Sequence, residues 1–314
     1  MAIKNVCVMG GSGFVGSQLV CRLAATGMNV LVPTRHPERH RDLLVLPNVQ
    51  LVEADIHDPD TLDILLTGQD AVINLVGILN EYKNNNNFQH VHVDLAKTII
   101  TACQKNGISR YLHMSALHAD QTAGQSVYLR SKGEAEHLIH TFSSNELKIT
   151  SFRPSVIFGP DDKFINLFAK MIHLSPGILP LACPNARFAP VYIGDVVDSM
   201  VHAINDAKSF SKRINLCGPN TYSLKEIVQF IAATLNKSCF ILGLPNSLAK
   251  LQAKLLQYAP GKPFTMDNYH SLQTPSVCPE GGTCSTSMET IVPTYIGRNN
   301  QQNHFDGFRR RAKR

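Results

Sequence analysis

The sequence predicts an α/β fold, in which a doubly wound parallel sheet carries a smaller C-terminal lobe. Three observations predict this class. Apolar strand-like runs alternate with helix-like runs in the first half of the chain, a glycine-rich turn joins the first strand to the first helix, and the alternation ends after Pro154. Alternation of this kind favours parallel strands joined by right-handed crossovers. The 314 residues are enough for one large domain and a lobe.

The predicted strands of the first half are rich in Val, Ile and Leu and lack polar alternation, as expected for strands that are buried on both faces. They span 5–10, 29–35, 49–55, 71–77, 110–116 and 148–154. The helical patterns between them lie near 14–27, 59–67, 88–106 and 126–144. We therefore assign residues 1–160 to one domain of the nucleotide-binding type.

Helical patterns dominate the second half and define the lobe, which we assign to residues 161–297. They lie near 162–174, 194–206, 223–236 and 245–258, with short extended pieces at 188–193, 213–217 and 239–242. We expect part of 188–217 to return to the main sheet. Residues 298–314 are polar and then basic, so we expect a disordered tail there.

Charge and cysteine content exclude several classes of protein. The net charge is +6, and the last six residues supply five of the positive charges, so the rest of the chain carries about +1. A basic tail of this kind does not indicate a nucleic-acid-binding fold. The eight cysteines form no CxxC pair, so we expect reduced thiols and no metal site. With no transmembrane run and no signal-peptide pattern, the expected location is cytoplasmic.

The turn Gly10-Gly11-Ser12-Gly13-Phe14-Val15-Gly16 is the first element with chemical meaning, because it follows a strand and opens a helix. Gly10 permits the tight turn, Gly13 allows a pyrophosphate to approach the backbone, and Gly16 allows close helix packing. The helix N-terminus offers free N–H groups to phosphates. In this context the pattern predicts a Rossmann-type domain that binds a dinucleotide.

The end of the second strand indicates which dinucleotide is preferred. NAD-selective sites usually place an acidic residue there for the ribose hydroxyls. This sequence places Arg35 there instead, and a guanidinium suits a 2′-phosphate. We therefore predict NADP(H), with NAD(H) as the alternative.

Tyr128 and Lys132 form a Tyr-x-x-x-Lys pair on a predicted helix, so both side chains share one face. A nearby ammonium is expected to lower the pKa of the phenol, which makes Tyr128 a candidate proton donor or acceptor. Lys132 is also a candidate contact of the nicotinamide ribose.

With these elements the chain resembles the extended short-chain dehydrogenase/reductase family. Further motifs carry the resemblance: EADIHD with Asp55 and Ile56, the N-L-V-G run with Val76 and Gly77, the segment with Arg153 and Pro154, and PVYIGDV. The resemblance implies that those six residues contact the cofactor.

A narrower resemblance covers about residues 3–297. It rests on YLRSKGEAE, FRPSVIFGPDDKF, PVYIGDV, LPNSLAKLQAKLLQ, TMDNYHSLQ and METIVPTYI. These segments resemble bacterial relatives of the NADPH-binding accessory subunit of respiratory complex I, and a similar protein of coenzyme Q synthesis. The resemblance implies a respiratory-chain or quinone-biosynthesis partner.

One departure puts turnover in doubt. Where the family places a catalytic Ser or Thr, this sequence has Ala116, with Ser115 one residue earlier. Neighbouring strand residues face opposite sides, so Ser115 is a catalytic candidate only if the strand end bends. Three functions follow: an accessory or assembly protein with little turnover, an NADPH-dependent reductase of a quinone-like or isoprenoid compound, and a sugar-nucleotide epimerase or dehydratase. The third is the weakest.

The stretch 244–258 is amphipathic, with Leu248, Leu251, Leu255 and Leu256 on one face. We expect this face to pack onto the core of the lobe. The alternative is a surface that meets a membrane or a membrane-protein partner. Together with the basic tail, that alternative implies peripheral attachment to the cytoplasmic face of the inner membrane.

Overall fold

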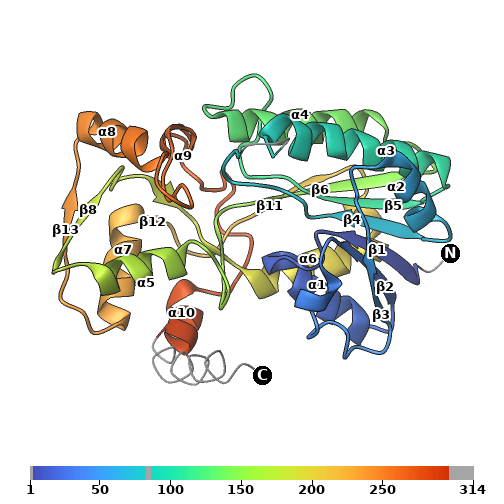
Figure 1. The fold of residues 1–314 in the computed structure, drawn as a ribbon, viewed down its shortest axis with the longest axis horizontal. Coiled ribbons are helices and arrows are strands. Elements are labelled where there is room, and N and C mark those ends of the chain that lie inside the picture. The colour runs from blue at the N-terminus through green and yellow to red at the C-terminus, as the bar shows by residue number, and fades with distance from the viewer. Residues whose placement is uncertain (1–2, 83–85, 297–314) are drawn as a thin grey trace.

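A seven-stranded parallel sheet forms the centre of the larger domain (Figure 1). The computed structural model describes residues 3–82 and 86–296. The strand order is β11-β6-β5-β4-β1-β2-β3. The strands are β1 (Asn5–Met9), β2 (Asn29–Thr34), β3 (Val49–Glu53), β4 (Ala71–Asn74), β5 (Arg110–Met114), β6 (Lys148–Pro154) and β11 (Arg213–Leu216). The order reverses between β1 and β4, which is where doubly wound sheets bind ligands. The predicted fold class is confirmed.

Helices cover both faces of this sheet (Figure 1). One face carries α1 (Phe14–Ala25) and α6 (Ile193–Asn205), which pack against each other. The other carries α2 (Pro59–Leu66), the π-helical turn Gln89–Asp94 that runs into α3 (Leu95–Lys105), and α4 (Val127–Thr141). Each layer has its own apolar core, so the sheet is buried on both faces as its apolar strands require.

The lobe is built from short elements around a separate core. Its helices are α5 (Ile165–Leu174), α7 (Leu224–Thr234), α8 (Asn246–Leu256), α9 (Met266–Ser271) and α10 (Met288–Ile296). Three two-stranded ribbons join them: β7 (Ile157–Phe158) with β10 (Val191–Tyr192), β9 (Arg187–Phe188) with β12 (Tyr222–Ser223), and β8 (Ile178–Leu181) with β13 (Phe240–Gly243). No helix within the described residues is long and apolar enough to cross a membrane.

Side-chain caps fix where several of these helices begin. Asp58 accepts a hydrogen bond from Thr61 N at the start of α2, and Ser126 accepts one from Leu129 N at the start of α4. A cap of this kind satisfies a helix N–H group that would otherwise lack a partner. The N-cap of α4 is thereby fixed at Ser126, two residues before Tyr128.

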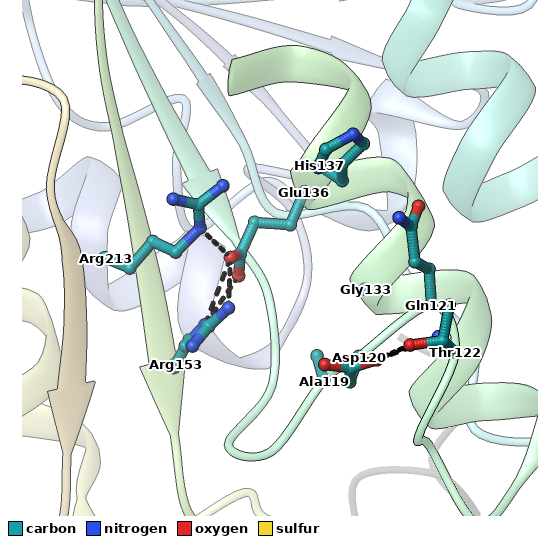
Figure 2. A pocket seen from close by; sticks show the side chains of 9 residues that line it. All are labelled: Ala119, Asp120, Gln121, Thr122, Gly133, Glu136, His137, Arg153 and Arg213. Carbon is teal, nitrogen blue, oxygen red and sulfur yellow. Dashed lines mark hydrogen bonds and ion pairs between the residues drawn. The ribbon is translucent and has the colours of Figure 1, made fainter. Parts of the chain in front are cut away.

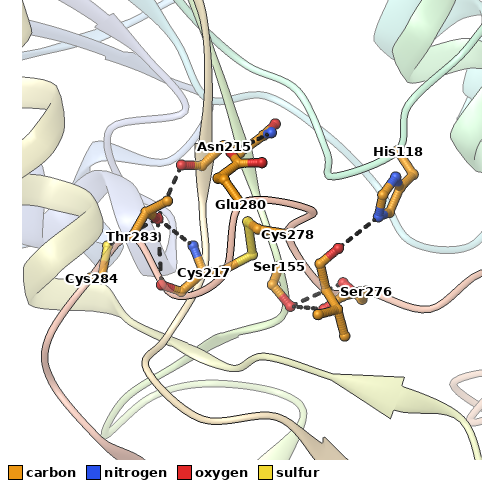
Figure 3. Close-up of a disulfide and its surroundings, with 10 residues drawn as sticks. His118, Ser155, Asn215, Cys217, Ser276, Cys278, Glu280, Thr283 and Cys284 are labelled. Atoms are coloured by element: carbon orange, nitrogen blue, oxygen red, sulfur yellow. Dashed lines mark hydrogen bonds between the residues drawn. A yellow bond between two sulfur atoms is a disulfide. The ribbon is translucent and has the colours of Figure 1, made fainter.

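The expectation of reduced thiols is wrong for one pair, because Cys217 and Cys278 form a disulfide (Figure 3). Cys217 follows β11, and Cys278 lies in the segment between α9 and α10. The two cysteines are 61 residues apart, so their spacing carried no signal, and only the folded chain brings their Cα atoms to 6.0 Å. Ser155 also donates to Ser276 O in this region. Within the described residues, the other six cysteines are free.

Three of the four leucines named above do not pack onto the core of the lobe, so the preferred expectation is wrong for them, and Leu256 is half-buried. Leu248, Leu251 and Leu255 are 48%, 51% and 65% exposed. The buried residues of α8 are instead Ala249 and Ala253. Small side chains let the helix lie close to the lobe, and its large apolar side chains therefore point outward.

The predicted basic tail, 298–314, lies outside the described residues.

Candidate functional site

The glycine turn has the close backbone geometry that its sequence predicts. Gly10 has a φ of 75°, a left-handed conformation that glycine adopts without strain. A Cβ at Gly10 would lie 3.3 Å from Leu75 C and Val76 N at the end of β4. A Cβ at Gly16 would lie 2.2 Å from Gly10 O, so no larger residue fits there. The turn thus lies at the point where the strand order reverses.

The first turn of α1 is free of competing groups. Gly13 is its N-cap and supplies no side-chain hydrogen bond, and the first turn holds no acidic residue. Ser12 Oγ lies 3.5 Å from Thr34 Oγ1 of β2. Phe14 and Val15 pack into the core beneath. The positive end of the helix dipole therefore faces an uncharged turn, which suits an anion.

The ends of β2 and β3 bring the adenine-side candidates together. Arg35 is exposed directly after β2. Asp55 Oδ1 accepts a hydrogen bond from His57 N at 3.0 Å, and Ile56 packs against the core. Burial, His90 and Arg35 all lower the pKa of His57, against Asp55, which raises it. A guanidinium, a carboxylate and an apolar side chain thus share one edge of the sheet.

Lys132 lies over the end of β4. Its Nζ donates to Met114 O at 3.0 Å, and a Cβ at Gly77 would lie 2.9 Å from that Nζ. Glycine at position 77 therefore makes room for the lysine. Burial lowers the pKa of Lys132 to about 8. The structure thus brings Lys132, Gly77 and Val76 beside the glycine turn.

Tyr128 differs from the expectation drawn from its spacing to Lys132. Burial, and then the carboxylate of Asp267, raise the pKa of Tyr128 to about 12. Asp267 belongs to α9 and accepts hydrogen bonds from the backbone N–H groups of Val127 and Tyr128. The expected lowering of the phenol pKa is therefore wrong, and Tyr128 is a protonated phenol at neutral pH.

His92 contacts the helix that carries this pair, and no role for a histidine was predicted from the sequence. Ile78 N donates to His92 Nε2 at 3.1 Å, so the neutral ring carries its proton on Nδ1, 2.8 Å from Ser131 Oγ. Ser131 in turn donates to Tyr128 O. Burial, and then Lys132, lower the pKa of His92 to about 2. One neutral imidazole thus joins the segment after β4 to α4.

The structure separates Ser115 from Tyr128. Ala116 packs in a small cluster with Ala119 and Leu129, against which Tyr128 also packs. Ser115 is buried, and its Oγ has no hydrogen-bond partner among the described residues. Within the described residues, no Ser or Thr hydroxyl forms a hydrogen bond with the phenol oxygen of Tyr128.

Arg153 lies in a different place from the glycine turn. It pairs with Glu136, which Arg213 also contacts (Figure 2). Burial raises the pKa of Glu136, but the hydrogen bond from Arg153 and further contributions outweigh it and lower that pKa overall. Pro154 ends β6 at the carboxyl edge of the sheet.

These arginines belong to a pocket of about 310 Å³. It is lined by Ala119, Asp120, Gln121, Thr122, Gly133, Glu136, His137, Arg153 and Arg213. It lies one turn of α4 beyond Lys132 and includes none of the glycine-turn residues. No group of three or more potential metal ligands is found within 3–82 and 86–296.

The first strand, the turn with three closely packed glycines and the first helix lie at the switch point of a parallel sheet, beside a helix with a Tyr-x-x-x-Lys pair. This arrangement defines a dinucleotide-binding protein of the extended short-chain dehydrogenase/reductase type. The chain belongs to the NAD dependent epimerase/dehydratase family, whose model matches residues 6–217.

Similar proteins come from two groups. NADH dehydrogenase (ubiquinone) 1 alpha subcomplex subunit 9, mitochondrial, of Mus musculus is 30% identical over 82% of this chain and 68% of its own length. The protein of the same name from Arabidopsis thaliana is 32% identical over 78% of this chain, which spans 61% of that relative. Among solved structures, MoeE5 in complex with UDP-glucose and NAD has a TM-score of 0.63 at 20% identity. It covers 76% of this chain and 85% of its own. This last likeness concerns the fold alone.

Proposed function

We propose that this protein binds NADP(H), in preference to NAD(H), and acts as a cofactor-holding accessory or assembly protein of the complex I type, with slow or no turnover. One observation supports the proposal: the glycine turn, Gly77 and Lys132 lie close together, and the residue that packs in the cluster against Tyr128 is Ala116, which has no hydroxyl.

Each residue of the site has a role in this proposal. The amides of Ser12, Gly13, Phe14 and Val15 would hold the pyrophosphate at the start of α1. Arg35 would bind the 2′-phosphate, and Asp55 with Ile56 would contact the adenosine. Val76 and Gly77 would lie under the cofactor, with Lys132 on the nicotinamide ribose and Pro154 near the nicotinamide. Arg153 would act indirectly, because its guanidinium is paired with Glu136.

The chemistry explains the low turnover. A bound nicotinamide supplies or accepts a hydride. Tyr128 can donate a proton to a nearby carbonyl oxygen, because its phenol is protonated at neutral pH. Within 3–82 and 86–296 no second hydroxyl donates to the Tyr128 phenol, and removal of one such donor typically costs about 10²–10³ in rate.

Binding is tested by isothermal calorimetry with NADPH and NADH. We expect tighter binding of NADPH, and no measurable binding to Gly13→Val, because a branched side chain would block the approach of the pyrophosphate. Cys21→Val, at an exposed position of the same helix, is the matched control and should bind normally. Arg35→Ser should weaken NADPH but not NADH. Equal NADPH binding by Gly13→Val would refute the site.

Turnover separates the candidate roles. Retained NADPH that quinone analogues do not oxidise supports the accessory role. Oxidation that is lost in Tyr128→Phe supports the reductase, which the intact Tyr128–Lys132 pair favours. Conversion of a nucleotide sugar would favour the epimerase instead.

We also propose that the protein acts beside the respiratory chain or quinone synthesis, at the cytoplasmic face of the inner membrane. Its similarity to mitochondrial respiratory subunits supports this placement. Co-purification of respiratory subunits with the tagged protein tests this proposal. It would be contradicted if no respiratory subunit were captured with the tagged protein from either the membrane fraction or the soluble fraction.

A further inference from the structure

We propose that the outer end of the lobe, formed by α8 and the β8–β13 ribbon, is a docking surface for an anionic lipid bilayer. This inference deepens the peripheral attachment proposed above by naming the surface and the occupant. It does not depend on dinucleotide binding, so the two can fail separately.

The ribbon is apolar on both of its faces. Leu179 and Ile241 are paired across it and buried against the lobe. On the other face Ile178 is paired with Phe240, and these side chains are 55% and 66% exposed. A ribbon that only covered a core would carry polar residues on its outer face.

The helix α8 extends the same surface. Gln252 Nε2 lies 3.5 Å from Pro180 O, which places α8 beside β8. Leu248, Leu251 and Leu255 are all exposed. At about 100° per residue they form one stripe on the helix. Figure 1 shows α8, β13 and β8 together at the end of the molecule that lies away from the large sheet. A contiguous apolar surface of this kind marks an interaction site.

The charge of the surrounding chain selects the occupant. Residues 163–194 and 227–266, which contain α5, the ribbon and α8, hold no Asp or Glu and seven Lys or Arg. Lys254 lies about 60° from Leu251 on the helical wheel, next to the leucine stripe, whereas Lys250 lies farther round the helix, with its Nζ 5.8 Å from the centre of the Tyr269 ring. Lysines that flank an apolar stripe extend toward anionic head groups while the leucines enter the acyl boundary.

Self-association through this surface fits less well. A symmetric dimer would bring the same lysines of two copies close together, and like charges at an interface are unfavourable.

Docking would also place the candidate site near the bilayer. The helix α8 packs on α9, and α9 supplies Asp267 to the start of α4 beside Tyr128. Only α8 and α9 would therefore lie between the bound membrane and the helix that carries Tyr128 and Lys132.

The test uses the fact that the chain contains no Trp. Leu255→Trp introduces a single tryptophan at the C-terminal end of the stripe, and its emission can be excited apart from that of the tyrosines. Its emission should shift to shorter wavelength on vesicles of equimolar phosphatidylglycerol and phosphatidylcholine, and brominated acyl chains should quench it. Ile64→Trp is the matched control, because Ile64 of α2 is 77% exposed on the larger domain, and it should show neither change.

Vesicle flotation of the full chain gives a second measurement. Leu251→Gln with Leu255→Gln should reduce binding about tenfold or more, whereas Ile64→Gln should not. Lys250→Gln with Lys254→Gln should reduce binding about tenfold on the anionic vesicles and leave binding to pure phosphatidylcholine unchanged. An unchanged circular dichroism spectrum and an unchanged thermal unfolding transition would show that each variant is folded.

Either of two results would overturn the proposal. One is an unchanged Leu255→Trp emission on anionic vesicles. The other is a dimer in sedimentation velocity that the double leucine substitution dissociates, because the surface would then be a contact between two copies of the chain.

Discussion

On the α6 side of the sheet, Arg110 is buried and each of the three nitrogens of its guanidinium has a hydrogen-bond partner. It donates to Ile204 O and Ala203 O of α6, to Lys148 O, and to the hydroxyls of Thr150 and Ser209. On the α4 side, Lys132 is also buried, but its Nζ has one hydrogen-bond partner among the described residues, Met114 O. Both side chains are cations, and only one of them is saturated by the protein.

The difference indicates what each cation is for. A buried charge with a complete set of partners joins elements together, and here it fixes β5 to α6. A buried charge with unused donors is costly to the fold, and such groups concentrate at functional sites. His113 lies on the same face of the sheet as Lys132, and neither of its ring nitrogens has a hydrogen-bond partner within the described residues.

The largest expected effect is on the saturated cation. Arg110→Met should lower the free energy of unfolding by about 3–5 kcal/mol, because it leaves several buried acceptors without donors. Urea denaturation measures this. Arg22→Met is the matched control: Arg22 pairs with Asp198 on the surface, and its loss should cost less than about 1 kcal/mol. Similar costs for both variants would remove the contrast.

Lys132→Met should have the opposite signature. The unfolding free energy should stay the same or rise, because an incompletely paired buried charge is replaced by an apolar chain. Affinity for NADPH should fall about tenfold, because a charge-assisted hydrogen bond is lost. Lys105→Met, on the surface beside Asp63, serves as the control for affinity. A strongly destabilised Lys132→Met would make Lys132 a structural residue like Arg110.

The smallest effect is a dependence of stability on pH. The pKa of Lys132 is about 8 in the folded protein and 10.5 ordinarily. Between these values the unfolded chain keeps the proton that the folded chain has released, so stability increases with pH in this window. Below about pH 8 both states are protonated and the contribution is constant. The stability of the wild type relative to Lys132→Met should therefore increase as the pH is raised from 8 to 10. Thermal unfolding of both proteins at several pH values would show this.

Local patterns were enough to predict most of the sheet. Six of its strands are runs rich in apolar residues between turns, and the strands of the structure begin where the runs begin. The helix α9 was not predicted, because six residues are too few to show a period. Its contribution to the site, Asp267 against Tyr128, joins residues 139 positions apart, and no spacing rule predicts such a contact.

The site was predicted in the same uneven way. The glycine turn, Gly77 and Lys132 followed from motifs, and the structure brings them together. His92 was missed because a histidine within a helical apolar run gives no signal of the backbone N–H that it accepts from a neighbouring segment. The raised pKa of Tyr128 depends on burial, which the spacing to Lys132 does not report.

The bond between Cys217 and Cys278 closes a covalent ring that contains α7, β13, α8 and α9. A protease that cuts the backbone once inside this ring, for example after the exposed Lys254, would leave a single molecule of nearly unchanged mass. Its two fragments would separate on a denaturing gel only after treatment with a thiol. A nicked lobe could therefore pass as intact protein in any preparation that is analysed without reductant.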